Sequence, residues 1–186
     1  MIAAKNDNAH AHLSAQLADR TLSRVYLALV WDVPIPLVGT IDLPVGRDHK
    51  NRLKQAIKRG NTSSGQRAVT HYKTLKNHHD ALSLVECRLE TGRTHQIRVH
   101  MKYINHPLFN DSNYGGDQIL RGTTFTKYKQ FVQNCFKLLP RQALHAKTLG
   151  FKHPVSGEKM MFESELPEDM TVVVKKWENY IANRND

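Results

Sequence analysis

Residues 89–106 read LETGRTHQIRVHMKYINH, and their pattern predicts a strand followed by a helix. An alternating segment runs into it and is broken at Thr91-Gly92. Ile97 and Met101 then recur at the spacing of one helical face. We therefore expect a strand that turns directly into an amphipathic helix, with Thr94 as the helix N-cap.

The flanking sequence extends this unit into a sheet with helices. Alternating or apolar segments predict strands at residues 23–32, 68–75 and 81–90, and a hairpin at 142–152 and 158–164. Further helices are expected at residues 7–20 (capped by Asp7), 128–139 and 168–183. The strand at 23–32 is apolar on both faces, which favours a central position. Strands and helices do not alternate strictly, so the predicted class is α+β, with a mixed, mostly antiparallel sheet and flanking helices.

Composition limits the class of protein. A chain of 186 residues, 40% hydrophobic and 24% charged, fits one globular domain. Cys87 and Cys135 are too few for a disulfide framework or an all-cysteine zinc site, which favours reduced thiols and a cytoplasmic location. The longest apolar run, residues 25–31, is far shorter than the ~20 residues of a membrane span, and no export signal is expected.

The charge is strongly basic and unevenly distributed. Lys and Arg total 27 against 17 acids, a net charge of +10, which favours a nucleic acid over a membrane surface as partner. Residues 46–67 hold one acid, Asp48, and seven bases: Arg47, Lys50, Arg52, Lys54, Lys58, Arg59 and Arg67. Residues 60–65 have the composition of a flexible loop. We expect a mobile basic arm that binds RNA phosphates; a solvated loop without a partner is the alternative.

Polar side chains are concentrated at the strand-to-helix junction. They are Arg93, His95, Gln96, Arg98 and His100. Arginines beside a helix N-terminus favour anions such as phosphates and carboxylates. The two histidines are five residues apart rather than four, so no metal site is predicted. Taken alone, the pattern also fits a capped helix with a solvated polar face.

Three ordered motifs resemble one enzyme family. Residues 91–116, TGRTHQIRVHMKYINHPLFNDSNYGG, resemble the hallmark of the ribosomal large-subunit (RluA-like) RNA pseudouridine synthases. Residues 4–30 resemble the family's helix and the following strand with its Lys/Arg-x-Tyr-x-Ala pattern. Residues 143–170 resemble its C-terminal hairpin. The resemblance covers residues 2–169, with 170–186 as a C-terminal helix, so 1–186 is expected to be a single, partial catalytic domain.

The resemblance implies an activity and a set of site residues. These enzymes convert uridine in RNA to its carbon-linked isomer without a cofactor, by flipping the base into a cleft. An aspartate acts as nucleophile, a tyrosine contacts the base and an arginine pairs with the aspartate. The counterparts here are Tyr26 and Arg98, and Arg98→Ala is expected to leave folding nearly intact. Arg93, His95 and Gln96 are expected to contact RNA, and large-subunit ribosomal RNA is the expected substrate.

One element of the family pattern is absent from the chain. The nucleophilic aspartate belongs to an Arg-Leu-Asp motif immediately upstream of the segment that matches residues 2–7. The chain is therefore expected to lack the first strands and to be inactive alone. Glu90 lies in Arg88-Leu89-Glu90, which looks similar to this motif. It belongs to the strand before the helix, however, so it is a poor substitute for the nucleophile. Asp7 fits a helix cap better than a catalytic residue.

Several interpretations stay open. The chain could be a fragment, the downstream half of a two-chain enzyme whose upstream half is a separate protein, or an RNA-binding protein without catalysis. A generic basic RNA-binding module is the alternative function. It explains the charge, but it does not explain why the three motifs occur in the family's order.

Overall fold

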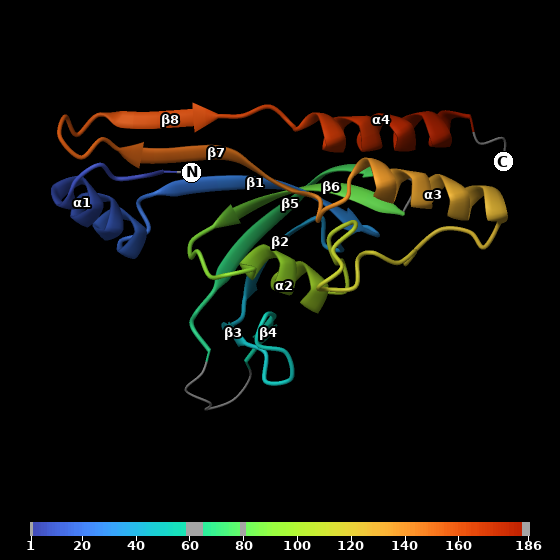
Figure 1. The fold of residues 1–186 in the computed structure, drawn as a ribbon, viewed down its shortest axis with the longest axis horizontal. Coiled ribbons are helices and arrows are strands. Elements are labelled where there is room, and N and C mark those ends of the chain that lie inside the picture. Colours follow the sequence, from blue (N-terminus) through green and yellow to red (C-terminus); the bar gives the residue numbers. More distant parts are fainter. Residues whose placement is uncertain (1, 59–64, 79–80, 184–186) are drawn as a thin grey trace.

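The computed structural model describes residues 2–58, 65–78 and 81–183. Within them, six strands form one antiparallel sheet in the order β2-β5-β6-β1-β7-β8, and two short strands, β3 and β4, form a second sheet (Figure 1). The strands are β1 Ser23–Trp31, β2 Val38–Asp42, β3 Val45–Arg47, β4 Gln55–Ile57, β5 Val69–His78, β6 Leu82–Leu89, β7 Leu144–Lys152 and β8 Lys159–Glu163. The helices are α1 Asp7–Ala18, α2 Gln96–Tyr103, α3 Thr126–Leu138 and α4 Glu168–Ala182. The predicted α+β class with an antiparallel sheet is confirmed.

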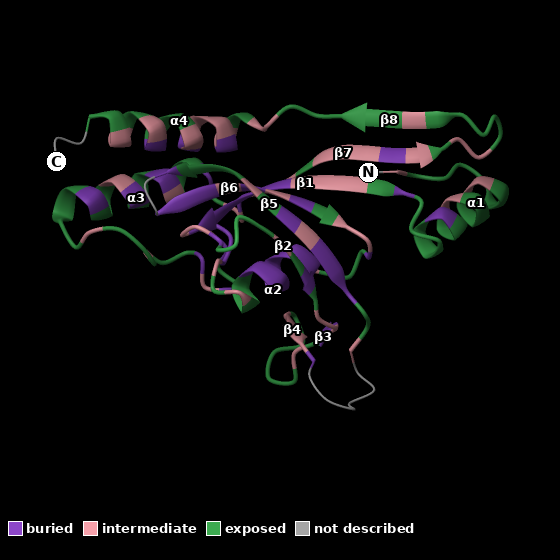
Figure 2. Ribbon diagram, turned by 180° about the vertical axis from the view of Figure 1, so that it is seen from behind, coloured by how far each residue is buried: buried purple, intermediate pink, exposed green. Residues whose placement is uncertain are grey.

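The strand β1 lies inside the large sheet, as its two apolar faces predict. It pairs with β6 on one side and β7 on the other. Residues 28–31 are completely buried. Figure 2 shows the burial concentrated where β1, β5 and β6 cross the middle of the molecule. Alternate residues of β1 therefore reach two separate hydrophobic layers.

Helices cover both faces of the sheet. On one face, Leu29 and Trp31 of β1 pack with residues of α3 and α4. On the other, Ala28 and Val30 pack with Ile97 and Met101 of α2. Because alternate residues of a strand point to the same face, Tyr26 lies on the same face as Ala28 and Val30. The apolar face of α2 packs against this face of β1.

Both predicted helix caps are wrong. The N-cap of α1 is Asn6, whose Oδ1 accepts a hydrogen bond from the backbone N–H of Ala9 at 2.9 Å. The residue before α2 is His95, which has φ 56° and makes no side-chain cap. Thr94 therefore does not cap α2. A non-glycine residue in the left-handed region turns the chain sharply, and this turn brings His95 against a neighbouring loop, as described below.

The basic segment is more ordered than the sequence predicts. Part of it forms β3 and β4, whose Val45 and Ile57 pack with Val99 of α2 and with Tyr114. Arg59 and the glycine-rich stretch after it lie outside the described residues. The expected mobile arm is therefore, in its described part, a small sheet held against α2.

The helix α1 attaches to the hairpin of β7 and β8 through a polar residue. Gln16 is buried, and its amide donates to the backbone oxygen of Lys152 and accepts from the same residue's N–H, at 2.8 and 2.7 Å. Leu17, the next residue of the helix, is 49% exposed. None of the described helices is long and apolar enough to cross a membrane.

Candidate active site and RNA-binding surface

Tyr26 faces a wide cleft on the α2 side of the sheet. The cleft has a volume of about 640 Å³ and is mostly apolar. Its walls come from the start of β1, from β7 and β8, and from the end of α1. They include Leu22, Leu149, Phe151 and Phe162, and the rings of the last two stack with centroids 5.8 Å apart. An apolar wall of this kind with a tyrosine at its edge can accept a planar base.

One carboxylate, Glu163, is among the described residues that line this cleft. Its side chain is largely exposed and pairs with Lys147 at 3.5 Å. The alternative carboxylate considered from the sequence, Glu90, does not line the cleft.

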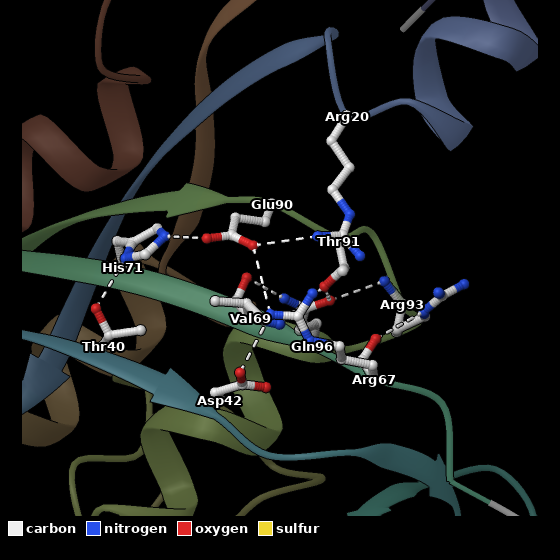
Figure 3. A network of polar contacts seen from close by, with 10 residues as sticks. All are labelled: Arg20, Thr40, Asp42, Arg67, Val69, His71, Glu90, Thr91, Arg93 and Gln96. Atoms are coloured by element: carbon white, nitrogen blue, oxygen red, sulfur yellow. Dashed lines mark hydrogen bonds and ion pairs between the residues drawn. The ribbon is translucent and has the colours of Figure 1, made fainter.

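Glu90 is already held by cations. Its Oε1 lies 2.8 Å from His71 Nε2, and its Oε2 lies 3.5 Å from Arg20 and 3.9 Å from Arg67 (Figure 3). Arg20 lies in the loop after α1, His71 lies in β5, and Glu90 directly follows β6. The Glu90 carboxylate therefore links this loop to the two strands. These contacts agree with the sequence-based judgement that Glu90 is a poor nucleophile.

Gln96 fixes the turn between β6 and α2. Its Oε1 accepts from Thr91 Oγ1 at 2.8 Å and from the N–H of Arg93 at 3.0 Å (Figure 3). Its amide nitrogen donates to Val69 O and Thr70 Oγ1 at 2.9 and 3.0 Å. With four bonds made and 2% of its surface exposed, Gln96 has no free group for RNA. The predicted RNA contact is therefore wrong, and Gln96 instead positions Arg93.

Arg98 forms a buried ion pair with Asp111. Its Nε and Nη2 each donate to one carboxylate oxygen at 2.7 Å, and the two side chains are 9% and 0% exposed. Among the described residues, Nη1 has no hydrogen-bond partner. The guanidinium also lies 4.8 Å from the centre of the Tyr114 ring.

This pair corrects one expectation. The sequence predicts that Arg98 can be removed without harm to the fold, but the arginine neutralises a fully buried carboxylate, so it has a structural role. Asp111 lies inside the stretch that resembles the family hallmark. The sequence pattern gives no sign of its pairing with Arg98.

The strands β3 and β4 form a short hairpin in the basic segment, here called the basic hairpin. Tyr114 connects this hairpin to the start of α2. Its hydroxyl accepts the backbone N–H of Gln55 in β4 at 2.9 Å and bonds His95 Nδ1, also at 2.9 Å. Burial, with Arg98 nearby, lowers the pKa of His95 from its usual value, so the ring is neutral at pH 7. His95 is therefore part of this network and is partly buried, and its contact with RNA stays a prediction.

A basic cleft lies between this hairpin and the β6–α2 turn. It has a volume of about 540 Å³, and the described residues that line it include Arg47, Arg52 and Arg93 but no Asp or Glu. These three were predicted from two distant segments, and the fold brings them together. Three guanidinium groups without a lining carboxylate favour a polyanion such as the RNA backbone.

The three lysines that the sequence also assigns to RNA binding differ in how far they are exposed. Lys50 is exposed, and its backbone N–H donates to Asp48. Lys54 is half-buried and lines a separate, smaller cavity beside Tyr114. Lys58 is 7% exposed, so it is not on the open surface, contrary to the prediction.

A metal site is not evident in the described part of the chain. No three His, Cys, Asp or Glu side chains among these residues are grouped closely enough to hold an ion.

Comparison with known proteins gives consistent matches. The sequence model of the RNA pseudouridylate synthase family matches residues 1–103. An uncharacterized RNA pseudouridine synthase of Chlorobaculum parvum is 42% identical over 95% of this chain and 53% of its own length. Ribosomal large subunit pseudouridine synthase D of Zymomonas mobilis is 44% identical over 100% of this chain and 54% of its own length. The chain thus spans about half the length of these relatives.

The fold has a counterpart among solved structures. Human RNA pseudouridylate synthase domain containing 4 superposes with a TM-score of 0.68 at 20% identity. The superposition covers 93% of this chain and 69% of the human one. At this identity, the likeness concerns the fold.

Proposed function

Since the chain belongs to the RNA pseudouridylate synthase family, we propose that it takes part in converting uridine to pseudouridine in RNA. The observation that carries the proposal is that Tyr26 faces an open apolar cleft on the face of β1 that packs against α2. A base that leaves its stack needs such a surface, because an aromatic ring replaces the lost stacking. In this proposal the uracil lies against Tyr26.

The proposed reaction needs a nucleophile that the cleft does not supply by itself. Glu163, the carboxylate lining the described cleft, is largely exposed and paired with Lys147. Covalent catalysis requires an activated, positioned group. We therefore propose that the aspartate of an Arg-Leu-Asp motif, as in the family, completes the site, and that residues 1–186 alone do not turn over uridine.

Arg98 has a narrower role in this proposal than in the sequence analysis. Two of its nitrogens are occupied by Asp111. Only the Nη1 side is available to orient a second carboxylate. A guanidinium that is already fixed by one ion pair would hold that group with little loss of conformational freedom.

Large-subunit ribosomal RNA is the proposed substrate. A relative 44% identical to this chain bears the name of a ribosomal large subunit enzyme. The basic cleft of Arg47, Arg52 and Arg93 supports an RNA partner by its charge. We propose a cytoplasmic location, which agrees with two buried, unpaired thiols at Cys87 and Cys135.

RNA binding through the basic cleft gives a first prediction. The triple substitution Arg47→Gln, Arg52→Gln and Arg93→Gln is expected to weaken binding and to flatten its salt dependence. For each phosphate of single-stranded RNA that the variant no longer neutralises, the log–log slope falls by about 0.7. The measurement is fluorescence anisotropy of a labelled RNA across a series of salt concentrations.

The matched control replaces the exposed Lys127, Lys129 and Lys137 of α3 by Gln, which removes the same charge elsewhere. An equal change of slope in both triple variants would show that the cleft is not a specific RNA-binding surface. A parallel assay of pseudouridine formation separates catalysis from the alternative of a binding module. A protein that binds RNA but forms no pseudouridine, even with the Arg-Leu-Asp segment present, is a binding module.

A further inference from the structure

Arg24 is a partly buried arginine whose charge is not neutralised within the described structure. It lies on β1, two residues before Tyr26 and on the same face. Its Nε is buried and has no hydrogen-bond partner, and no described residue forms an ion pair with its guanidinium. Among the described residues, the buried Arg98 and the partly buried Arg141 each pair with an aspartate. A buried donor left unpaired is costly, so a missing acceptor is expected here.

The turn before α2 makes room for this guanidinium. At Gly92 a Cβ atom would lie 2.1 Å from Nη1 of Arg24 and 3.0 Å from its Cζ. Any larger residue at this position would displace the arginine. The backbone of the β6–α2 turn, which Gln96 fixes, therefore packs directly against the Arg24 head group.

The surroundings of Arg24 carry surplus positive charge. Besides the Tyr26 cleft, Arg24 lines a neighbouring cavity of about 360 Å³ that also includes Arg20, His71 and Arg88. The carboxylate in that cavity, Glu90, is already shared by Arg20, Arg67 and His71. Arg88 pairs with Glu86. The local charge thus favours an external anion as the acceptor for Arg24.

The position of Arg24 relative to Tyr26 indicates which anion. Residues i and i+2 of a strand project from the same face about 7 Å apart. A nucleotide whose base lies on Tyr26 carries phosphates within roughly this reach. A guanidinium binds phosphate oxygens through paired N–H groups. We propose that Arg24 binds the backbone phosphate next to the uridine that occupies the Tyr26 cleft. The proposal rests on the proposed function, because it assumes that RNA enters this cleft.

The test uses the 186-residue chain and a short single-stranded RNA that contains one uridine. Binding is measured by fluorescence anisotropy, with normal phosphates and with an uncharged methylphosphonate on either side of the uridine. At one of these two positions the methylphosphonate is expected to weaken wild-type binding about tenfold or more, as removal of a charge-assisted hydrogen bond implies. Arg24→Gln is expected to bind both RNAs equally weakly. Its salt slope should be shallower by about 0.7.

Two further variants complete the design. Arg24→Lys keeps the charge, so it should retain the wild-type salt slope while losing part of the affinity. Lys137→Gln, at an exposed position of α3, should bind RNA as the wild type does. Circular dichroism of each variant checks that the fold is intact.

The failure of this proposal is distinguishable from that of the proposed function. If the wild-type chain binds no RNA, the proposed function loses its support. A second outcome is that the chain binds RNA through Arg47, Arg52 and Arg93 while Arg24→Gln and the methylphosphonate each weaken binding independently. If the loss of affinity with both changes is then the sum of the two separate losses in binding free energy, Arg24 does not contact that phosphate. The proposal would then be overturned.

Discussion

Arg98→Ala is expected to lower the free energy of unfolding by about 3–5 kcal/mol. The substitution leaves the carboxylate of Asp111, which is fully buried, without its bidentate partner. It also removes the guanidinium from beside the Tyr114 ring, to which the basic hairpin is bonded. For a domain whose total stability is about 5–15 kcal/mol, such a loss is severe.

Urea unfolding followed by circular dichroism measures this loss. Arg98→Lys should recover only part of it, because an ammonium group cannot donate in a planar fork. The double variant Arg98→Met with Asp111→Leu should be more stable than Arg98→Ala, since it leaves no unpaired charge. The control is Arg88→Ala, at an exposed side chain of the otherwise largely buried β6, which should cost no more than about 1 kcal/mol. Equal stabilities of the Arg98→Ala and Arg88→Ala variants would refute the structural role.

Tyr26 gives the second large effect. Tyr26→Phe keeps the ring and removes the hydroxyl, so we expect RNA affinity to change little. If the hydroxyl moves a proton, turnover should fall by about 10²–10⁴-fold. Tyr26→Ala also removes the stacking surface, and its RNA affinity should fall on the order of tenfold. Both are measured as pseudouridine formed in RNA by the protein joined to its Arg-Leu-Asp segment.

The matched control for Tyr26→Phe is Tyr180→Phe on α4, where the ring stacks on Phe131 away from the cleft. It should leave turnover unchanged. Wild-type turnover in Tyr26→Phe would exclude a role for the hydroxyl. Unchanged affinity in Tyr26→Ala would show that the base does not lie on this ring.

The sequence predicts the large sheet well because its strands are long and strongly patterned. The segment at 23–31 is apolar on both faces, and its central position follows from this alone. The short strands β2, β3 and β4 were not predicted. They are only three to five residues long, and β2 and β3 each contain a glycine, so their period-2 pattern cannot be distinguished from a loop.

The site is less predictable, because its key contacts join distant segments. Tyr26 and Arg98 were identified by resemblance to a family, not by their surroundings. The partner of Arg98 lies 13 residues away, in a loop whose composition suggests only turns. Gln96 was assigned to RNA binding because it stands among arginines, and only the fold shows its bonds to Val69 and Thr70. Burial, which separates a structural polar residue from a binding one, is a tertiary property.

Tritium release from large-subunit ribosomal RNA labelled at uridine C5 tests the proposed activity most directly. Forming the carbon–carbon glycosidic bond expels the hydrogen from C5, so each turnover releases one tritium to water. We expect release by the protein joined to an upstream segment with the Arg-Leu-Asp motif, and loss of release when Tyr26 is replaced by Phe. Residues 1–186 alone should bind the RNA without releasing tritium. Release by residues 1–186 alone, or no release by the extended protein under conditions where it binds RNA, would contradict the account.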